Sequence, residues 1–134
     1  MDYTKPFRLG LRPNDVPYVV SAKQNDCFTR FLQIQLTRDD TNYTPGNGVT
    51  YLFRCRRPDG ALITEDSVTQ IESRTLVTDL GGGVIQIELT DDALAVPGRC
   101  LCDLCMTKDE QVLSTDLFVI DVVASPNVSS GTLT

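Results

Sequence analysis

Hydrophobic and polar residues alternate along most of the chain in short segments, and turn-forming residues separate one segment from the next. Between residues 29 and 37, Leu32, Ile34 and Leu36 occupy every second position, whereas Gln33 and Gln35 lie between them. Successive side chains of a β-strand point to opposite faces, so this alternation indicates a strand with one buried face. No long segment has the apolar period of a helix. The pattern therefore predicts an all-β protein.

Six segments carry this pattern clearly, and a seventh region is less regular. The predicted strands are 18–22, 29–37, 49–56, 84–89, 99–107 and 112–123, and region 61–80 is expected to supply the remainder. Strands and turns at this spacing are typical of a sandwich or a barrel. We expect an antiparallel β-sandwich of the Ig-like kind, with about seven to eight strands.

Three turns between these segments have a specific chemistry. Residues 58–60, Pro-Asp-Gly, fit a tight turn with glycine at its end. Residues 90–94 are expected to form one short helical turn, because Thr90 can cap its N-terminus and two aspartates follow at the positive end of the helix dipole. The polar residues 108–111 indicate a four-residue hairpin loop.

Prolines and small polar residues divide the chain into three parts. Residues 1–16 are expected to form an N-terminal arm, 17–124 the β-sandwich, and 125–134 a tail or linker. The strand phases predict one cluster of core side chains between two sheets. Its expected members are Leu32, Ile34, Tyr51, Phe53, Ile85, Leu89, Leu104, Phe118 and Ile120.

The N-terminal arm holds the candidate partner-binding residues. Phe7, Leu9 and Leu11 alternate with Arg8 and Arg12, and three prolines in the first 17 residues disfavour a stable helix. In one interpretation, the arm pairs as an edge strand of its own domain. In the other, it adds a strand to a neighbouring protomer or another protein, and these five residues contact that partner.

Composition and charge exclude several classes of function. The net charge is −6, and it divides into +1 over residues 1–74 and −7 over residues 75–134. An acidic half without a basic stripe is a poor match for a phosphate backbone, so nucleic acid is not an expected partner. The chain has no histidine, which removes the commonest general base and a common metal ligand. No residue is assigned a catalytic role.

The five cysteines include the run CLCDLC. They are Cys27, Cys55, Cys100, Cys102 and Cys105. A strand through this run places Cys100 and Cys102 on one face and Cys105 on the opposite, wetter face, whereas zinc knuckles place a CxxC pair on a turn so that both sulfurs reach one ion. We predict that Cys100 and Cys102 are buried, reduced thiols, and we expect no metal site and no cofactor.

The N-terminal residues and the length of the apolar runs indicate the cellular compartment in which the chain is made. Residues 1–15 lack the apolar core of a signal peptide, and no apolar run is long enough to span a bilayer. We therefore expect synthesis in the cytosol and no membrane partner. Reduced thiols agree with that expectation.

The order of four sequence pieces resembles a known family. The pieces are NDCFTRFLQIQLTRDD, VTYLFRCRRPDGALI, LGGGVIQIELTDDALAVPGRC and CDLCMTKDEQVLSTDLFVIDV, and the resemblance extends over roughly residues 19–123. They resemble the N-terminal domain of the phage baseplate upper protein (BppU-type) family. The CLCDLC run departs from that family, which usually has aromatic, aliphatic and charged residues at these positions.

The resemblance implies a non-enzymatic virion structural protein. Such a tail or baseplate domain would attach a receptor-binding or tail-fibre assembly to the phage particle, with other phage structural proteins as partners. The resemblance also implies a homo-oligomer, with a trimer favoured, assembled in the bacterial host cytoplasm. The chain would then be either a stand-alone adaptor or the first domain of a longer protein. The alternative is a bacterial Ig-like surface or carbohydrate-binding module, although the missing signal peptide and the absence of tryptophan count against it.

Overall fold

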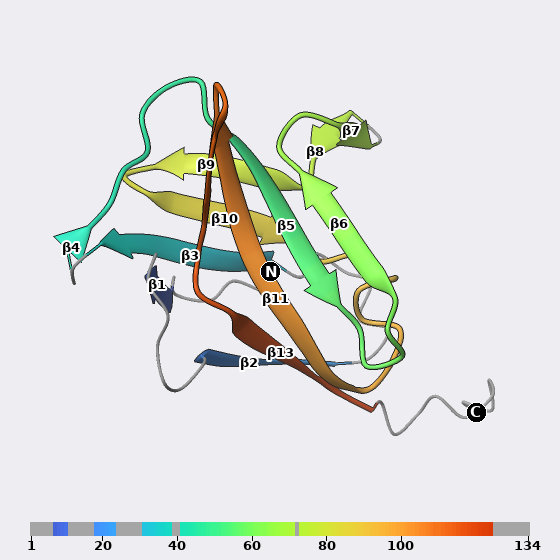
Figure 1. The fold of residues 1–134 in the computed structure, drawn as a ribbon. Coiled ribbons are helices and arrows are strands. Elements are labelled where there is room, and N and C mark those ends of the chain that lie inside the picture. Colours follow the sequence, from blue (N-terminus) through green and yellow to red (C-terminus); the bar gives the residue numbers. More distant parts are fainter. Residues whose placement is uncertain (1–6, 11–17, 24–30, 39–40, 72, 125–134) are drawn as a thin grey trace.

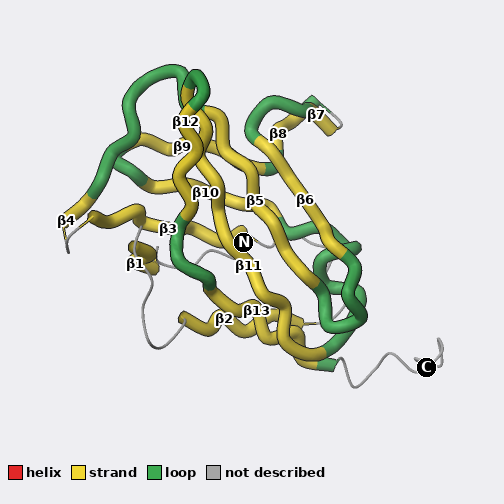
Figure 2. The backbone as a smooth tube through the Cα atoms, in the orientation of Figure 1, coloured by secondary structure: helices red, strands yellow, loops and turns green. Residues whose placement is uncertain are grey.

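The computed structural model describes residues 7–10, 18–23, 31–38, 41–71 and 73–124, and every regular element within them is a β-strand (Figures 1 and 2). The strands are β1 Phe7–Gly10, β2 Tyr18–Lys23, β3 Phe31–Arg38, β4 Thr41–Asn42, β5 Thr50–Arg56, β6 Leu62–Asp66, β7 Gln70–Ile71, β8 Arg74–Thr75, β9 Val77–Gly81, β10 Val84–Glu88, β11 Gly98–Lys108, β12 Gln111–Ser114 and β13 Phe118–Val123. The predicted all-β class is confirmed.

Two sheets face each other, and their strands run in clearly different directions (Figure 1). The first sheet has the order β1-β3-β10-β9, and the short β4 pairs with β3. The second sheet has the order β2-β13-β11-β5-β6, and β12 pairs with β11 as well. Strands β7 and β8 form a separate small hairpin. The architecture is a sandwich.

Both sheets are mixed, which corrects the prediction of purely antiparallel sheets. Strand β1 pairs in parallel with β3, and β2 pairs in parallel with β13, whereas the remaining pairs are antiparallel. The alternation within a segment determines which side chains are buried, but it carries no information about the direction of a distant partner. The strands are also more numerous than seven to eight, because region 61–80 supplies four strands and the predicted strand 112–123 supplies two.

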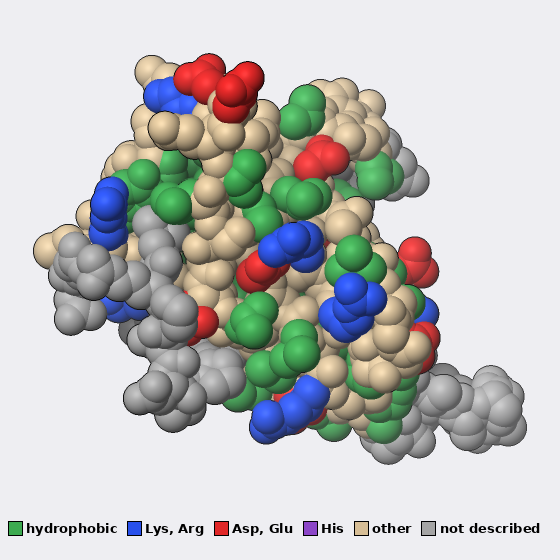
Figure 3. Space-filling view, in the orientation of Figure 1, with side chains coloured by type: hydrophobic (Ala, Val, Ile, Leu, Met, Phe, Trp, Pro, Cys, Tyr) green, Lys and Arg blue, Asp and Glu red, His purple; other side chains and the backbone are tan. Residues whose placement is uncertain are grey.

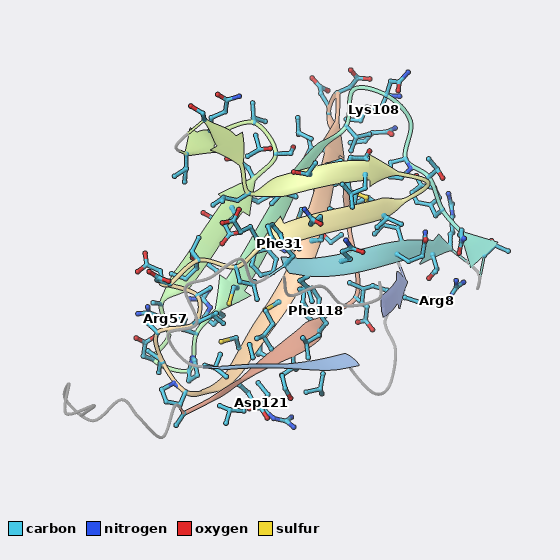
Figure 4. The ribbon with its side chains drawn as sticks, turned by 180° about the vertical axis from the view of Figure 1, so that it is seen from behind. Arg8, Phe31, Arg57, Lys108, Phe118 and Asp121 are labelled. Carbon is cyan, nitrogen blue, oxygen red and sulfur yellow. The ribbon has the colours of Figure 1, made fainter. Side chains whose placement is uncertain are left out.

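The side chains between the sheets form one hydrophobic cluster that contains all nine predicted core residues. Each of the nine is no more than 5% exposed. The ring centroids of Phe53 and Phe118 lie 6.2 Å apart, and Figure 4 shows Phe118 at β13, below β3 in that view. The predicted strand phases are therefore confirmed at these positions.

Two of the predicted turns have the expected geometry. Gly60 has a φ of 91°, which glycine adopts freely, and its N–H donates to the carbonyl oxygen of Arg57 at 2.9 Å. The N–H of Ala93 donates to the hydroxyl of Thr90 at 3.3 Å, which is the bond expected of an N-cap. The N–H of Leu94 donates to the carbonyl oxygen of Thr90 at 3.3 Å, so a single helical turn follows the cap.

The hairpin between β11 and β12 is tighter than the predicted four-residue loop. Lys108 pairs with Gln111, so only Asp109 and Glu110 connect the two strands. Asp109 has a φ of 54°, in the left-handed region that two-residue hairpin turns require and that aspartate tolerates.

An extra residue divides the predicted strand 112–123 into β12 and β13. Strand β11 pairs with both: the N–H of Thr115 donates to the carbonyl oxygen of Leu104 at 2.9 Å, and Phe118 lies opposite Cys102. Between these two pairs, β11 has one residue and its partner has two, which is the geometry of a β-bulge.

The bulge reverses the face that alternate residues present. Phe118 faces the core, so unbroken alternation would turn Val112 and Ser114 inward as well. The register instead turns Leu113 and Thr115 inward, opposite core-facing residues of β11. A strand that gains one residue exchanges its two faces, which a smooth alternation cannot reveal.

Candidate interaction surfaces

The buried thiols of the second sheet form a packed cluster. Cys55 of β5 lies opposite Cys102 of β11, and these two side chains and Cys100 are at most 1% exposed. A hydrogen bond with Cys55 and burial both raise the pKa of the Cys100 thiol, which keeps it protonated and unreactive. No group of three metal-ligating side chains occurs in the part of the chain that the structure describes. The predicted burial of Cys100 and Cys102 is confirmed, and Cys27 lies outside the described residues.

The outer face of the second sheet presents apolar side chains around an ion pair, and both are visible in Figure 3. Arg54 donates two hydrogen bonds to Asp103, with distances of 2.8 Å from Nε to Oδ1 and 2.5 Å from Nη2 to Oδ2. These bonds and the charge of Asp103 raise the pKa of Arg54, so its guanidinium stays charged. Leu62, Leu101 and Leu117 are about half exposed and share a shallow hollow with the pair. Apolar side chains around a bidentate ion pair are suited to a protein–protein contact.

Cys105 also lies on this outer face, but it is not the wet position that the sequence suggested. It is 6% exposed, and its Sγ lies 3.2 Å from the Oγ of Ser114. Cys105 lies opposite Ser114 on one side and Leu52 on the other, so neighbouring strands flank it on both sides. The central position of β11 in the sheet accounts for its burial.

Strand β12 has one free edge. Strand β11 occupies one side of it, and no strand within the described residues pairs with the other side. Hydrogen-bonded pairs alternate along an antiparallel ladder, so the bond between Thr115 and Leu104 directs the backbone N–H and C=O groups of Val112 and Ser114 away from β11. The side chain of Val112 is 64% exposed.

A groove opens beside this edge, between the β11–β12 hairpin and the loop that follows β4. It has a volume of about 490 Å³, and its lining includes Tyr43, Val49, Met106, Lys108 and Leu113. Met106 belongs to the core cluster, and Tyr43 and Val49 pack against that cluster, so much of the lining is apolar. Figure 4 places Lys108 at the hairpin end of the sandwich. The groove thus combines an apolar lining with one cation.

The loop wall of this groove is held by a close backbone approach. The N–H of Tyr43 donates to the carbonyl oxygen of Leu36 at 2.9 Å. A Cβ atom on Gly83, whose φ is 82°, would lie 2.1 Å from the carbonyl oxygen of Tyr43, so only glycine fits there. The guanidinium of Arg38 lies 5.9 Å from the centroid of the Tyr43 ring. The wall is therefore part of the folded sandwich.

The N-terminal segment that was predicted as an arm contributes an edge strand to the first sheet. Phe7–Gly10 forms β1, Leu9 is 2% exposed, and Arg8 donates a 2.8 Å hydrogen bond to the side chain of Asn42. This geometry corresponds to the interpretation in which the segment pairs within its own domain. Leu11 and Arg12 lie outside the described residues, and the role of Phe7, Arg8, Leu9, Leu11 and Arg12 in binding a partner stays a prediction.

Glu65 on β6 is a buried carboxyl that the sequence did not single out. Its side chain is 5% exposed, and neither oxygen has a hydrogen-bond partner within the described residues. Burial is the main cause that raises the pKa of Glu65 to about 8. The charge of Glu88 also raises this pKa, whereas Thr90 lowers it in part. A carboxyl in this setting makes the free energy of unfolding depend on pH.

The free edge of β12 was not predicted from the sequence either. The available signal was the pair Val112-Leu113, since two adjacent apolar residues interrupt the alternation that leads to Phe118. In the structure these two side chains lie on opposite faces, and both are exposed.

Comparisons with known proteins connect this fold to phage proteins. The profile of the BppU N-terminal domain matches residues 8–133, which is most of the chain. Among solved structures, the N-terminal domain of phage TP901-1 ORF48 superposes with a TM-score of 0.59 and 14% sequence identity, over 87% of this chain and 97% of that one. No curated protein sequence gave a match. Among the described residues, no helix is long and apolar enough to cross a membrane.

Proposed function

The chain belongs to the BppU N-terminal domain family, and on that premise we propose that it anchors a receptor-binding or tail-fibre assembly to the body of a phage particle. It is a phage structural protein related to baseplates, and its family is not known for catalysis. The observation that carries the proposal is the extent of the family match. Residues 8–133 include strands from both sheets, the outer face of the second sheet and the groove beside β12.

The surface chemistry supports a protein partner. The second sheet exposes Leu62, Leu101 and Leu117 around the Arg54–Asp103 pair, which provides apolar contact area with a fixed polar centre. All of the large, strongly exposed apolar side chains of the described residues are aliphatic. Aliphatic side chains bury well against another protein, whereas sugar rings stack on exposed aromatic rings.

The proposal includes several finer expectations. Partners would be baseplate, tail or fibre subunits of the same particle, and the complex would assemble in the cytoplasm of the bacterial host. The chain would form a homo-oligomer, with a trimer favoured, which light scattering on the purified chain measures directly. Phe7, Arg8, Leu9, Leu11 and Arg12 of the N-terminal segment are the candidate contacts; of these, the structure describes the side chains of Arg8, which is exposed, and Leu9, which is buried.

Chemical cross-linking of purified particles, read out by mass spectrometry, tests the proposal. We expect the chain to be present in the particle and to cross-link to a tail or baseplate subunit. Particles made without the chain should lack the receptor-binding or fibre assembly while retaining a complete tail tube. Particles that keep this assembly when the chain is absent would contradict the proposal.

A further inference from the structure

We propose that the free edge of β12 and the groove beside it bind an extended segment of another protein of the particle, which adds a strand to the second sheet. This inference rests on the proposed function, since it specifies how the domain holds one of its partners. The main chain of the bound segment would form hydrogen bonds to β12, and its side chains would contact the groove.

Along one edge of the second sheet, the described strands cover one part of the backbone and leave another part uncovered. Strand β2 pairs with β13 from Phe118 to Val123, and the N–H of Asp116 at the bulge donates to the carbonyl oxygen of Gly10 at 2.9 Å. Within the part of the chain that the structure describes, this cover ends at β12. Proteins commonly protect a free edge with charge or proline, but the outward backbone groups of β12 belong to Val112 and Ser114, which provide neither.

The groove lies where an added strand would place side chains. Side chains of a strand added beside β12 would alternate between the two faces of the sheet, and those on the inner face would enter the groove next to Leu113 and Tyr43. A volume of about 490 Å³ suits apolar side chains from such a segment. The expected occupant therefore has apolar residues at every second position.

The groove carries a positive charge from Lys108. Lys108 lies in the groove lining and makes no ion pair with any described residue. An ammonium group in this position favours a carboxylate on the bound segment. The chemistry of the occupant is thus an extended, alternating apolar segment with one acidic side chain that reaches Lys108.

Hydrogen–deuterium exchange on purified particles tests the inference, with the free chain as reference. A peptide that covers residues 109–115 should exchange at least about tenfold more slowly in the particle than in the free chain, because Val112 and Ser114 gain hydrogen-bond partners. Equal exchange in the particle and in the free chain would overturn the inference while leaving the proposed function intact. Absence of the chain from the particle would overturn both.

Substitutions separate the edge from general effects on folding. Val112→Pro removes an N–H that points away from β11, and Val112→Thr is its matched control because it keeps that N–H and a β-branched side chain. Particles assembled with Val112→Pro should contain less than about a tenth of the normal amount of the chain, and Val112→Thr should assemble normally. Normal assembly of Val112→Pro would overturn the inference.

A second pair keeps the test valid if Val112→Pro does not fold. Leu113→Lys places a charge in the groove, and Leu80→Lys is the control, since Leu80 is 49% exposed and lies on β9. Both variants should melt near the temperature of the parent chain, and only Leu113→Lys should fail to enter particles. Equal incorporation of the two variants would contradict the inference. It would also be contradicted if the free chain formed a dimer in which β12 is already protected from hydrogen exchange.

Discussion

Strands β12 and β13 come from one stretch of sequence and pair with the same strand, β11, but their environments are opposite. The burial pattern of β13 is almost continuous, with Phe118 and Ile120 at most 1% exposed, and β2 covers its outer edge. All four residues of β12 are exposed, and its outer edge has no strand beside it in the described part of the chain. A bulge of one residue separates the two. Five of the six residues of β13 are apolar, against two of the four of β12, but composition alone does not account for the contrast. Val112 and Leu113 are exposed whereas Val119 and Ile120 are buried, so burial along this stretch also depends on what covers each strand.

The largest difference between the strands should appear in the free energy of unfolding when one apolar side chain is removed from each. Phe118→Ala should cost about 3 to 5 kcal/mol, because it leaves a cavity between the two sheets. Leu113→Ala should cost less than about 1 kcal/mol, because Leu113 is 43% exposed. Urea unfolding measures both values, and similar costs for the two substitutions would break the comparison.

The opposite edge of the second sheet, β6, should respond to pH. The folded-state pKa of Glu65, about 8, lies above its ordinary value of 4.5, so the folded state binds this proton more tightly than the unfolded state does. The stabilisation is complete below pH 4.5 and is lost as the pH rises through 8. From pH 5 to pH 8 the free energy of unfolding should fall by on the order of 3 kcal/mol more in the parent chain than in Glu65→Gln. Parallel pH profiles for the two proteins would show that Glu65 ionises normally.

Next in size is the effect of the bulge that joins β12 to β13. The hydroxyl of Thr115 accepts a hydrogen bond from the N–H of Leu104 at 3.0 Å, and the side chain is 7% exposed. Thr115→Val keeps the shape of the side chain but removes the hydroxyl that accepts the hydrogen bond from the N–H of Leu104. This substitution should therefore lower the free energy of unfolding by about 1 to 3 kcal/mol. Ser114→Ala, one position away on an exposed strand, should change stability by less than about 0.5 kcal/mol. Thermal melts of the two variants measure these losses. A larger loss of stability for Ser114→Ala than for Thr115→Val would contradict the assigned register.

The smallest effects concern the two faces of β11. Cys102→Ala should cost about 1 to 2 kcal/mol because Cys102 is 1% exposed and packs in the core. Cys105→Ser should stay within about 0.5 kcal/mol of the parent, because a hydroxyl can still bond to the Oγ of Ser114. Chemical denaturation tests both, and a larger loss for Cys105→Ser would show that the outer face is packed as tightly as the core.

Local alternation was sufficient to predict the class of fold and the core. Each of the nine predicted core positions lies in a segment whose period is two, and one-sided burial of a strand produces that period directly. The N-cap at Thr90 and the turn at Gly60 were also predictable, because their chemistry involves residues only a few positions apart.

Features that depend on distant parts of the chain could not be predicted in this way. The parallel pairing of β1 with β3 is set by the tertiary fold, and so is the burial of Leu9. The bulge beside Thr115 exchanges the faces of β12, although the sequence there looks like the start of one long strand. Glu65 and the groove beside Lys108 arise from side chains that meet only after folding.

Residue-resolved amide hydrogen exchange on the free chain, followed by NMR, tests the contrast between the two strands most directly. The amides of β13 should all be protected, because they bond to β11 on one side and β2 on the other. The amides of Val112 and Ser114 should exchange close to the rate of an unstructured peptide, since they point away from β11. Protection of Val112 and Ser114 equal to that of Val119 and Asp121 would contradict the free edge on which the binding of a partner strand depends.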